Sequence, residues 1–329
     1  MTVTVAAFAI RPLHDAPLLW FALTAVASAL AATQDVFVDA FAVRVLAPSE
    51  RGYGNTAQVA GYRVGMLIGG AALLVLVGRL GERTTLLSCA GVVAAASIGA
   101  FVGSANRDPH RSETSDAPRT SLPNEGKALG ARALARHVLR EETRPVLALA
   151  LTFKLGLHMA SSLLKPMLKD FGWSKERIGW AAVTVGSVSA LAGAAVGGFL
   201  HRKLGERRAL FASVVIQTLV CVPLVAVERL HAPFALSTVA IAFEHFGSGL
   251  GTTVLFAALM SATRPSDAGL HYTVLTSANA LAIGFGSLCG GMIADHAGLL
   301  AAFVVSALVC VLPAALLPRW GEASRASAS

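Results

Sequence analysis

The chain has 329 residues, of which 55% are hydrophobic and only 14% are charged, and its formal net charge is +8 at pH 7. A soluble domain usually carries about 25% charged residues, so this composition argues against a soluble globular protein. The positive charge does not indicate nucleic-acid binding, because the basic residues occur in short connections and form no continuous basic stripe on a soluble domain.

Long apolar stretches recur along the whole chain. A membrane-spanning helix needs about 20 apolar residues, and lipid offers no water to backbone polar groups, so each stretch should be helical. The sequence therefore predicts an all-α fold, a polytopic transmembrane helix bundle. We expect about nine membrane helices, at residues 17–45, 56–79, 84–103, 144–168, 175–200, 207–227, 233–262, 268–294 and 297–317.

A polar stretch separates the third expected helix from the fourth. Its first half has the composition of a disordered segment. Its second half places Arg132, Arg136 and Arg140 on one helical face, which fits either an amphipathic helix on an anionic membrane surface or a solvated linker helix. We therefore expect a partial N-terminal half, a cytoplasmic linker, a complete six-helix C-terminal half and a cytoplasmic tail, at residues 1–103, 104–143, 144–318 and 319–329.

The number of helices on each side of this linker is informative. Transporters are often built from three-helix repeats, with two repeats in each six-helix half. Three helices before the linker and six after it leave one repeat unaccounted for, so we interpret the N-terminal half as lacking its first three helices. With the linker in the cytoplasm, the cytoplasmic segments hold about twice as many Lys and Arg residues as the outer ones, as the positive-inside rule expects.

The usual signatures of enzymes and metal sites do not occur. No HExxH, GxSxG or Walker sequence is present, and the four cysteines lie inside apolar segments with no CxxC pair. We predict no metal, no cofactor and no enzymatic activity. Glycines such as Gly193, Gly197 and Gly198 indicate close packing between helices in lipid.

Ionisable residues inside apolar helices are costly, so each is a candidate functional residue. Asp35 and Asp39 are four residues apart and share a helical face. Burial favours the protonated form of a carboxylate, and a second carboxylate nearby favours it further. We expect Asp35 and Asp39 to couple transport to protons, although Asp39 could instead anchor or cap the helix end.

Four basic residues are candidates for binding a substrate. Arg63 could pair with an aspartate or bind an anion, or it could extend to the membrane interface. Lys154 lies two to three turns into its helix and needs an acidic partner or a hydrated cavity. His158 and His245 could bind substrate or serve as hydrogen-bonded core residues.

Glu244 lies in the middle of its helix, beside His245. Glycines at positions 247, 249 and 251 thin this helix, so it can bend there or admit a ligand. The G-x-G-x-G pattern is not a dinucleotide-binding loop, because no strand precedes it. We expect Glu244 to be a proton-coupling residue in the C-terminal half.

Several of these residues fall in motifs that resemble a known family. Ala32-Thr-Gln-Asp-Val-Phe-Val-Asp-Ala-Phe, Gly61-Tyr-Arg-Val-Gly-Met, Phe153-Lys-Leu-Gly and Phe243-Glu-His-Phe-Gly-Ser-Gly-Leu-Gly-Thr resemble the AmpG-type muropeptide permeases. These belong to the branch of the major facilitator superfamily that includes acetyl-coenzyme A transporters and some siderophore permeases. Gln34 and Tyr62 lie in the same motifs and are further substrate-binding candidates. After Lys-Leu-Gly the family usually has Asp, whereas this chain has Leu157.

The resemblance implies a secondary active transporter of the bacterial inner (plasma) membrane, coupled to protons. Its solute would be small and anionic, such as a muropeptide, with siderophores as an alternative class. We expect a multi-pass monomer with a cytoplasmic C-terminus, whose partners are the solute, protons and the lipid bilayer, and not nucleic acid. The alternative from another functional class is a truncated protein without transport activity, either a remnant or an interaction partner.

Overall fold

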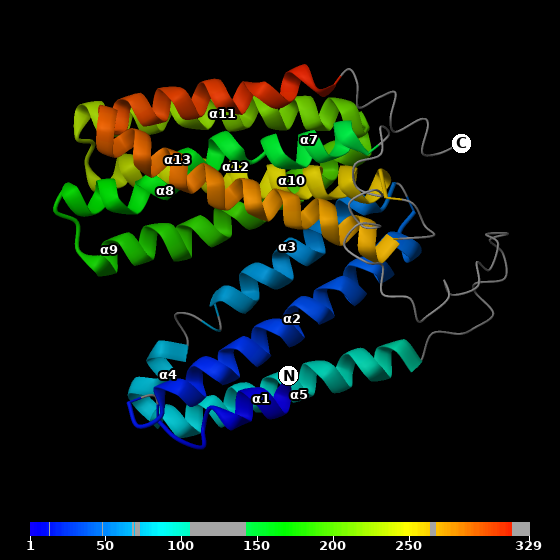
Figure 1. Cartoon of the computed structure of the whole chain (residues 1–329). Coiled ribbons are helices and arrows are strands. Elements are labelled where there is room, and N and C mark those ends of the chain that lie inside the picture. The colour runs from blue at the N-terminus through cyan, green and yellow to red at the C-terminus, as the bar shows by residue number, and fades with distance from the viewer. Residues whose placement is uncertain are drawn as a thin grey trace, which may run out of the picture. The chain divides into compact units, whose positions relative to one another are not determined.

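The computed structural model describes residues 1–12, 14–47, 49–67, 69, 73–105, 143–263 and 268–317. Within these residues every regular element is a helix, which confirms the predicted all-α class (Figure 1). The chain divides into two compact units, each described by itself below. They comprise Met1–Val38 with Ile68–Lys127 (unit 1) and Asp39–Leu67 with Ala128–Ser329 (unit 2).

Unit 1 contains α1 (Thr2–Ala7), most of α2 (Pro17–Val45), α4 (Leu73–Leu80) and α5 (Glu82–Ala105). Helices α1 and α4 both pack on α5. Gly81 joins α4 to α5 with a φ of 81°, a left-handed conformation that glycine adopts without steric cost.

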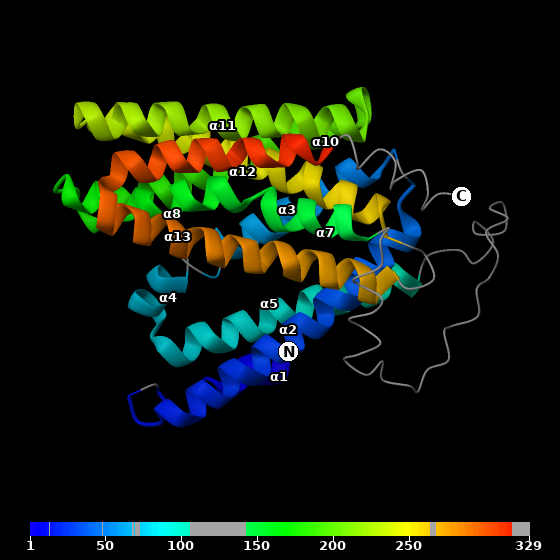
Figure 2. The ribbon, with the colours of Figure 1, turned by 45° about the horizontal axis from the view of Figure 1, so that its top comes forward.

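Unit 2 contains the end of α2 and all elements from α7 onward, together with α3 (Arg51–Leu67) (Figure 2). The remaining elements are α7 (Arg144–Thr152), α8 (Leu155–Asp170), α9 (Lys175–Gly179), the π-helical turn η3 (Trp180–Val185), α10 (Gly186–Leu204), α11 (Glu206–Leu230), α12 (Phe234–Ser261), α13 (Ala268–Val311) and the 3₁₀ turn η5 (Leu312–Ala315).

The described residues 56–67 and 73–79 of the segment expected at 56–79 belong to α3 and α4. Two other expected helices have interruptions that the apolar pattern does not reveal. The segment expected at 144–168 is broken between α7 and α8. The segment expected at 175–200 includes the π-helical turn η3. The last two expected helices correspond to the two parts of α13, which are separated by Gly298, whose φ of 85° and ψ of 162° are not helical. The arginine-bearing helix expected in the linker lies outside the described residues.

Six stretches of described helix are long and apolar enough to cross a membrane. The longest has 45 residues, more than twice the number that one passage needs, and the non-helical Gly298 divides it into two helices. The expected spans at 56–79 and 84–103 are not among the six. The stretches are Pro17–Asp39, Arg144–Asp170, Lys175–Leu204, Glu206–Leu230, Phe234–Ser261 and His271–Ala315.

Glycines bring the helices of unit 2 into close contact, as the sequence predicts. A Cβ atom on Gly193 of α10 would collide with the backbone carbonyl of Phe246 in α12, and one on Gly249 of α12 would collide with the carbonyl of Ala190. Small residues permit such backbone approach in lipid, where no hydrophobic force drives helix association. Helix α12 is therefore held closely against α10, and its polar side chains occupy fixed positions in the bundle.

Candidate functional site

A buried lysine, Lys154, lies at the interruption between α7 and α8. The chain leaves the α-helical hydrogen-bonding pattern at Phe153 and Lys154, and Lys154 precedes α8 with φ −103° and ψ −6°. The Lys154 side chain is only 2% exposed. A buried ammonium group requires hydrogen-bond acceptors to offset the loss of water.

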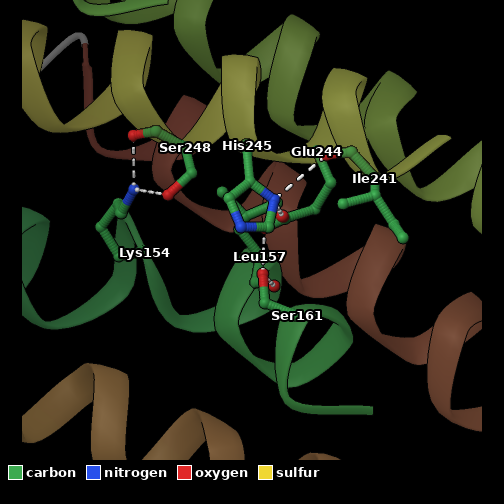
Figure 3. A network of polar contacts seen from close by, with 7 residues as sticks. All are labelled: Lys154, Leu157, Ser161, Ile241, Glu244, His245 and Ser248. Carbon is green, nitrogen blue, oxygen red and sulfur yellow. Dashed lines mark hydrogen bonds and ion pairs between the residues drawn. The ribbon is translucent and has the colours of Figure 1, made fainter. Parts of the chain in front are cut away.

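Helix α12 supplies these acceptors (Figure 3). Lys154 Nζ donates to the carbonyl oxygen of Ser248 at 2.8 Å and to Ser248 Oγ at 3.2 Å. It also donates to Thr252 Oγ1 at 3.1 Å. An ammonium group has three hydrogens to donate, and three acceptors lie within reach. All three are uncharged, so these contacts hold Lys154 in place without neutralising its charge.

A second polar group lies on the same two helices (Figure 3). Glu244 of α12 is 3% exposed, and its Oε1 accepts a hydrogen bond from Ser161 Oγ of α8. Its Oε2 lies 2.5 Å from Nδ1 of His245. The same Nδ1 lies 3.1 Å from the carbonyl oxygen of Ile241. Because a carbonyl only accepts, we assign the hydrogen to Nδ1, which leaves Nε2 able to gain or lose a proton.

Ser161 can serve both protonation states of this carboxyl group. Its single hydroxyl hydrogen has two acceptors within reach, Glu244 Oε1 and the carbonyl oxygen of Leu157 at 2.9 Å. When Glu244 is ionised, Ser161 donates to it. When Glu244 is protonated, the carboxylic acid can donate to Ser161 Oγ, and Ser161 donates to Leu157.

Two further basic residues lie near this network. His158 of α8 and Arg63 of α3 each interact electrostatically with Lys154, and His158 also interacts with Glu244. Within the described part of the chain, Arg63 Nε is buried and has no hydrogen-bond partner. With neutral histidines and a protonated Lys154, this group of residues contains two positive charges and one carboxylate, so it carries a net positive charge.

The predicted site residues are therefore only partly brought together. Unit 2 gathers Arg63, Lys154, His158, Glu244 and His245. Each of these five is a residue that its sequence context singles out.

The other candidates occupy different surroundings. Gln34 and Asp35 belong to unit 1 and are exposed, and Tyr62 is 66% exposed in α3. Asp39 belongs to unit 2, is half-buried and accepts a hydrogen bond of 2.8 Å from Gln58 Nε2.

Three residues of the network have no counterpart among the predicted site residues. Ser248 and Thr252 follow Glu244 at intervals of four, so the three form a polar stripe along α12. Ser161 follows Lys154 by seven residues and shares its helical face. This helical spacing of hydroxyl residues beside charged ones is a signal that the sequence does contain.

The sequence of the chain matches known transporter families over most of its length. Residues 146–328 match the Major Facilitator Superfamily, and residues 16–79 match the family described as Acetyl-coenzyme A transporter 1. Of the polar network, the segment 146–328 contains all members except Arg63 of α3, namely Lys154, His158, Ser161, Glu244, His245, Ser248 and Thr252. The motif-based resemblance to this superfamily is thus confirmed.

Individual relatives point to the same branch. A protein of Rickettsia conorii named putative transporter AmpG 4 is 24% identical over 302 residues, which cover 90% of this chain and 70% of that protein. The anhydromuropeptide permease of Escherichia coli K12 is 27% identical over 285 residues, or 85% of this chain, which spans only 56% of the permease. The family match covers more than half of the chain and its helices are suited to a membrane, so this multi-pass membrane protein belongs to the major facilitator superfamily of transporters.

Proposed function

We propose that the protein is a proton-coupled carrier of a small anionic solute. Glu244, assisted by His245 and Ser161, binds and releases the proton, while Lys154, His158 and Arg63 attract the anion. The observation that carries this proposal is the buried carboxylate of Glu244, which keeps hydrogen-bond partners in both protonation states. A coupling site needs this property, because a buried group without a partner in one state would be trapped in the other.

The charge of the site favours an anionic solute. Lys154 is bound only to neutral oxygens, and Arg63 Nε is buried without a partner among the described residues. A bound carboxylate or phosphate would compensate both charges, and arginine can bind such groups through two parallel hydrogen bonds. The relative in Escherichia coli is named an anhydromuropeptide permease, so an anhydromuropeptide is the first solute to test.

The other expectations complete the proposal. We place the protein in a bacterial-type inner membrane as a monomer, with a cytoplasmic C-terminus and a cytoplasmic linker at residues 104–143. Asp35 and Asp39 both remain candidates for a second protonatable site. Asp39 accepts a hydrogen bond from Gln58. Transport proceeds by rocking of two halves around a site near the bilayer midplane and involves no catalytic step.

The experiment is uptake into proteoliposomes under an imposed pH gradient. Purified protein is reconstituted, and accumulation of a radiolabelled anhydromuropeptide is followed with the outside more acidic than the inside. We expect accumulation above the equilibrium level, abolished by a protonophore. Uptake that is the same with and without the pH gradient would contradict proton coupling. Uptake of neutral but not of anionic solutes would contradict the assigned substrate class.

A further inference from the structure

A hollow in unit 2 lies apart from the polar network. It has a volume of 440 Å³ and is lined by Arg207, Arg208 and Phe211 from the beginning of α11, by Ala314 of η5 and by Leu317, which follows η5. Both arginines are exposed, and Phe211 is 55% exposed. The hollow therefore combines two positive charges with an apolar wall.

Its position along α11 corresponds to the boundary of a membrane span. Glu206–Leu230 is one of the six stretches suited to crossing a bilayer, and the two arginines lie in its first turn. From Ala209 onward the helix becomes apolar. In the predicted topology this end of α11 faces the cytoplasm, so the arginines lie at the depth of the lipid headgroups and Phe211 at the edge of the hydrocarbon.

The positive charge is available for a ligand. In the part of the chain that the structure describes, neither Arg207 nor Arg208 makes an ion pair, and the neighbouring Glu206 interacts with Arg51. Helix α11 starts after Gly205 with no side-chain cap. The free amide groups of its first turn add to the attraction for an anion.

We propose that this hollow binds the headgroup of an anionic phospholipid. The phosphate is held by Arg207 and Arg208, since guanidinium groups match phosphate oxygens in geometry and charge. The acyl chains lie along Phe211, the exposed part of the apolar wall. Basic pockets at the cytoplasmic side of membrane helices are suited to such headgroups, and the apolar wall distinguishes a lipid from a free phosphate ester.

Native mass spectrometry of the purified protein tests this proposal. The protein is titrated with phosphatidylglycerol or with phosphatidylcholine of the same acyl chains, and glycerol 3-phosphate is added as a soluble competitor. We expect a preference for phosphatidylglycerol of about tenfold or more, since each basic residue near an anionic surface contributes about 1 kcal/mol. Glycerol 3-phosphate should not displace the lipid.

Variants locate the site. R207Q/R208Q should lose the preference, and R207K/R208K should keep most of it because the charge remains. The matched control is K165Q/K169Q, which removes two exposed charges from the end of α8. The proposal is overturned if R207Q/R208Q binds phosphatidylglycerol as the unaltered protein does, if the control pair loses as much, or if glycerol 3-phosphate competes as well as the lipid.

Discussion

Ser161 of α8 and Glu244 of α12 are joined by a hydrogen bond, although 83 residues separate them in the sequence. Glu244 also contacts His245, the next residue in its own helix. The carboxyl group thus depends on one partner from each of two helices. A movement that separates α8 from α12 would remove the Ser161 contact and change how strongly Glu244 holds its proton, which links helix motion to protonation.

Replacing Glu244 by Gln should uncouple transport from the proton gradient. The amide keeps the size of the carboxyl group and can still accept from Ser161, so the protein should fold and bind solute. It cannot be protonated and deprotonated, so uptake driven by a pH gradient should fall to the equilibrium level while exchange of labelled for unlabelled solute persists. The control is Glu176→Gln, at an exposed position in α9. Gradient-driven accumulation by Glu244→Gln would exclude this residue as the coupling site.

Replacing Ser161 by Ala should change the pH dependence of uptake. The ionised form of Glu244 loses a donor, so proton release becomes harder and the midpoint of the pH profile should move to higher pH. The bond to the ionised carboxylate is worth about 1 kcal/mol more than the bond that the protonated form also loses, so the expected shift is roughly one pH unit. The neighbouring Ser162 bonds only to backbone carbonyls, so Ser162→Ala should leave the profile in place. A shift of equal size in both variants would argue against a specific role for Ser161.

Replacing Lys154 by Gln should weaken the binding of anionic solutes. In the proposed complex the solute accepts one of the three hydrogens that Lys154 otherwise donates to Ser248 and Thr252. Loss of this charge-assisted contact of about 1.5–3 kcal/mol should raise the KM by roughly 10-fold to 100-fold with less effect on the maximal rate. Stability should change little, because Ser248 O also accepts from Thr252 Oγ1 and so keeps a partner. Substrate titration of uptake and thermal unfolding in detergent measure the two effects, with exposed Lys165→Gln as the control. An unchanged KM would show that Lys154 is structural.

The sequence predicts much of the fold and the charged part of the site, for identifiable physical reasons. Apolar length alone indicates the helices, and the cost of burying charge singles out residues such as Lys154 and Glu244. The interruption at Phe153 does not follow from the sequence, because a local break of helical geometry needs no Pro or Gly when neighbouring helices supply hydrogen-bond partners. The role of Ser161 is not predicted from the sequence either, because a serine in a membrane helix usually donates its hydrogen bond to the backbone of its own helix.

Replacing Asp35 by Asn tests the proton-coupling prediction for unit 1. Asp35 lies in the stretch Pro17–Asp39, which is suited to a membrane, and it is exposed in unit 1. If it carries a transported proton, Asp35→Asn should lower the accumulation ratio while solute exchange continues. Asp15→Asn, at an exposed position before α2, is the control. Normal accumulation by Asp35→Asn would leave Asp39 and Glu244 as the coupling candidates.

The absence of a side chain at Gly186 leaves room for the His245 ring beside Glu244. A larger residue at position 186 therefore tests the role of His245 without changing any ionisable group. A Cβ atom at position 186 would lie 2.5 Å from Cδ2 and 2.6 Å from Nε2 of the His245 ring. The φ of −58° at this position suits alanine, so Gly186→Ala should fold but displace the ring. We expect reduced gradient-driven uptake and a loss of stability of about 1–3 kcal/mol, as is usual for overpacking.

Gly179, at the other end of the same π-helical turn, is the matched control for Gly186. Its φ is −60°, and a Cβ atom there would meet nothing within 4 Å. Gly179→Ala should therefore leave both uptake and thermal unfolding unchanged. If Gly186→Ala also transports normally under a pH gradient, the precise placement of His245 is not needed for coupling, and Glu244 would have to exchange its proton through Ser161 alone.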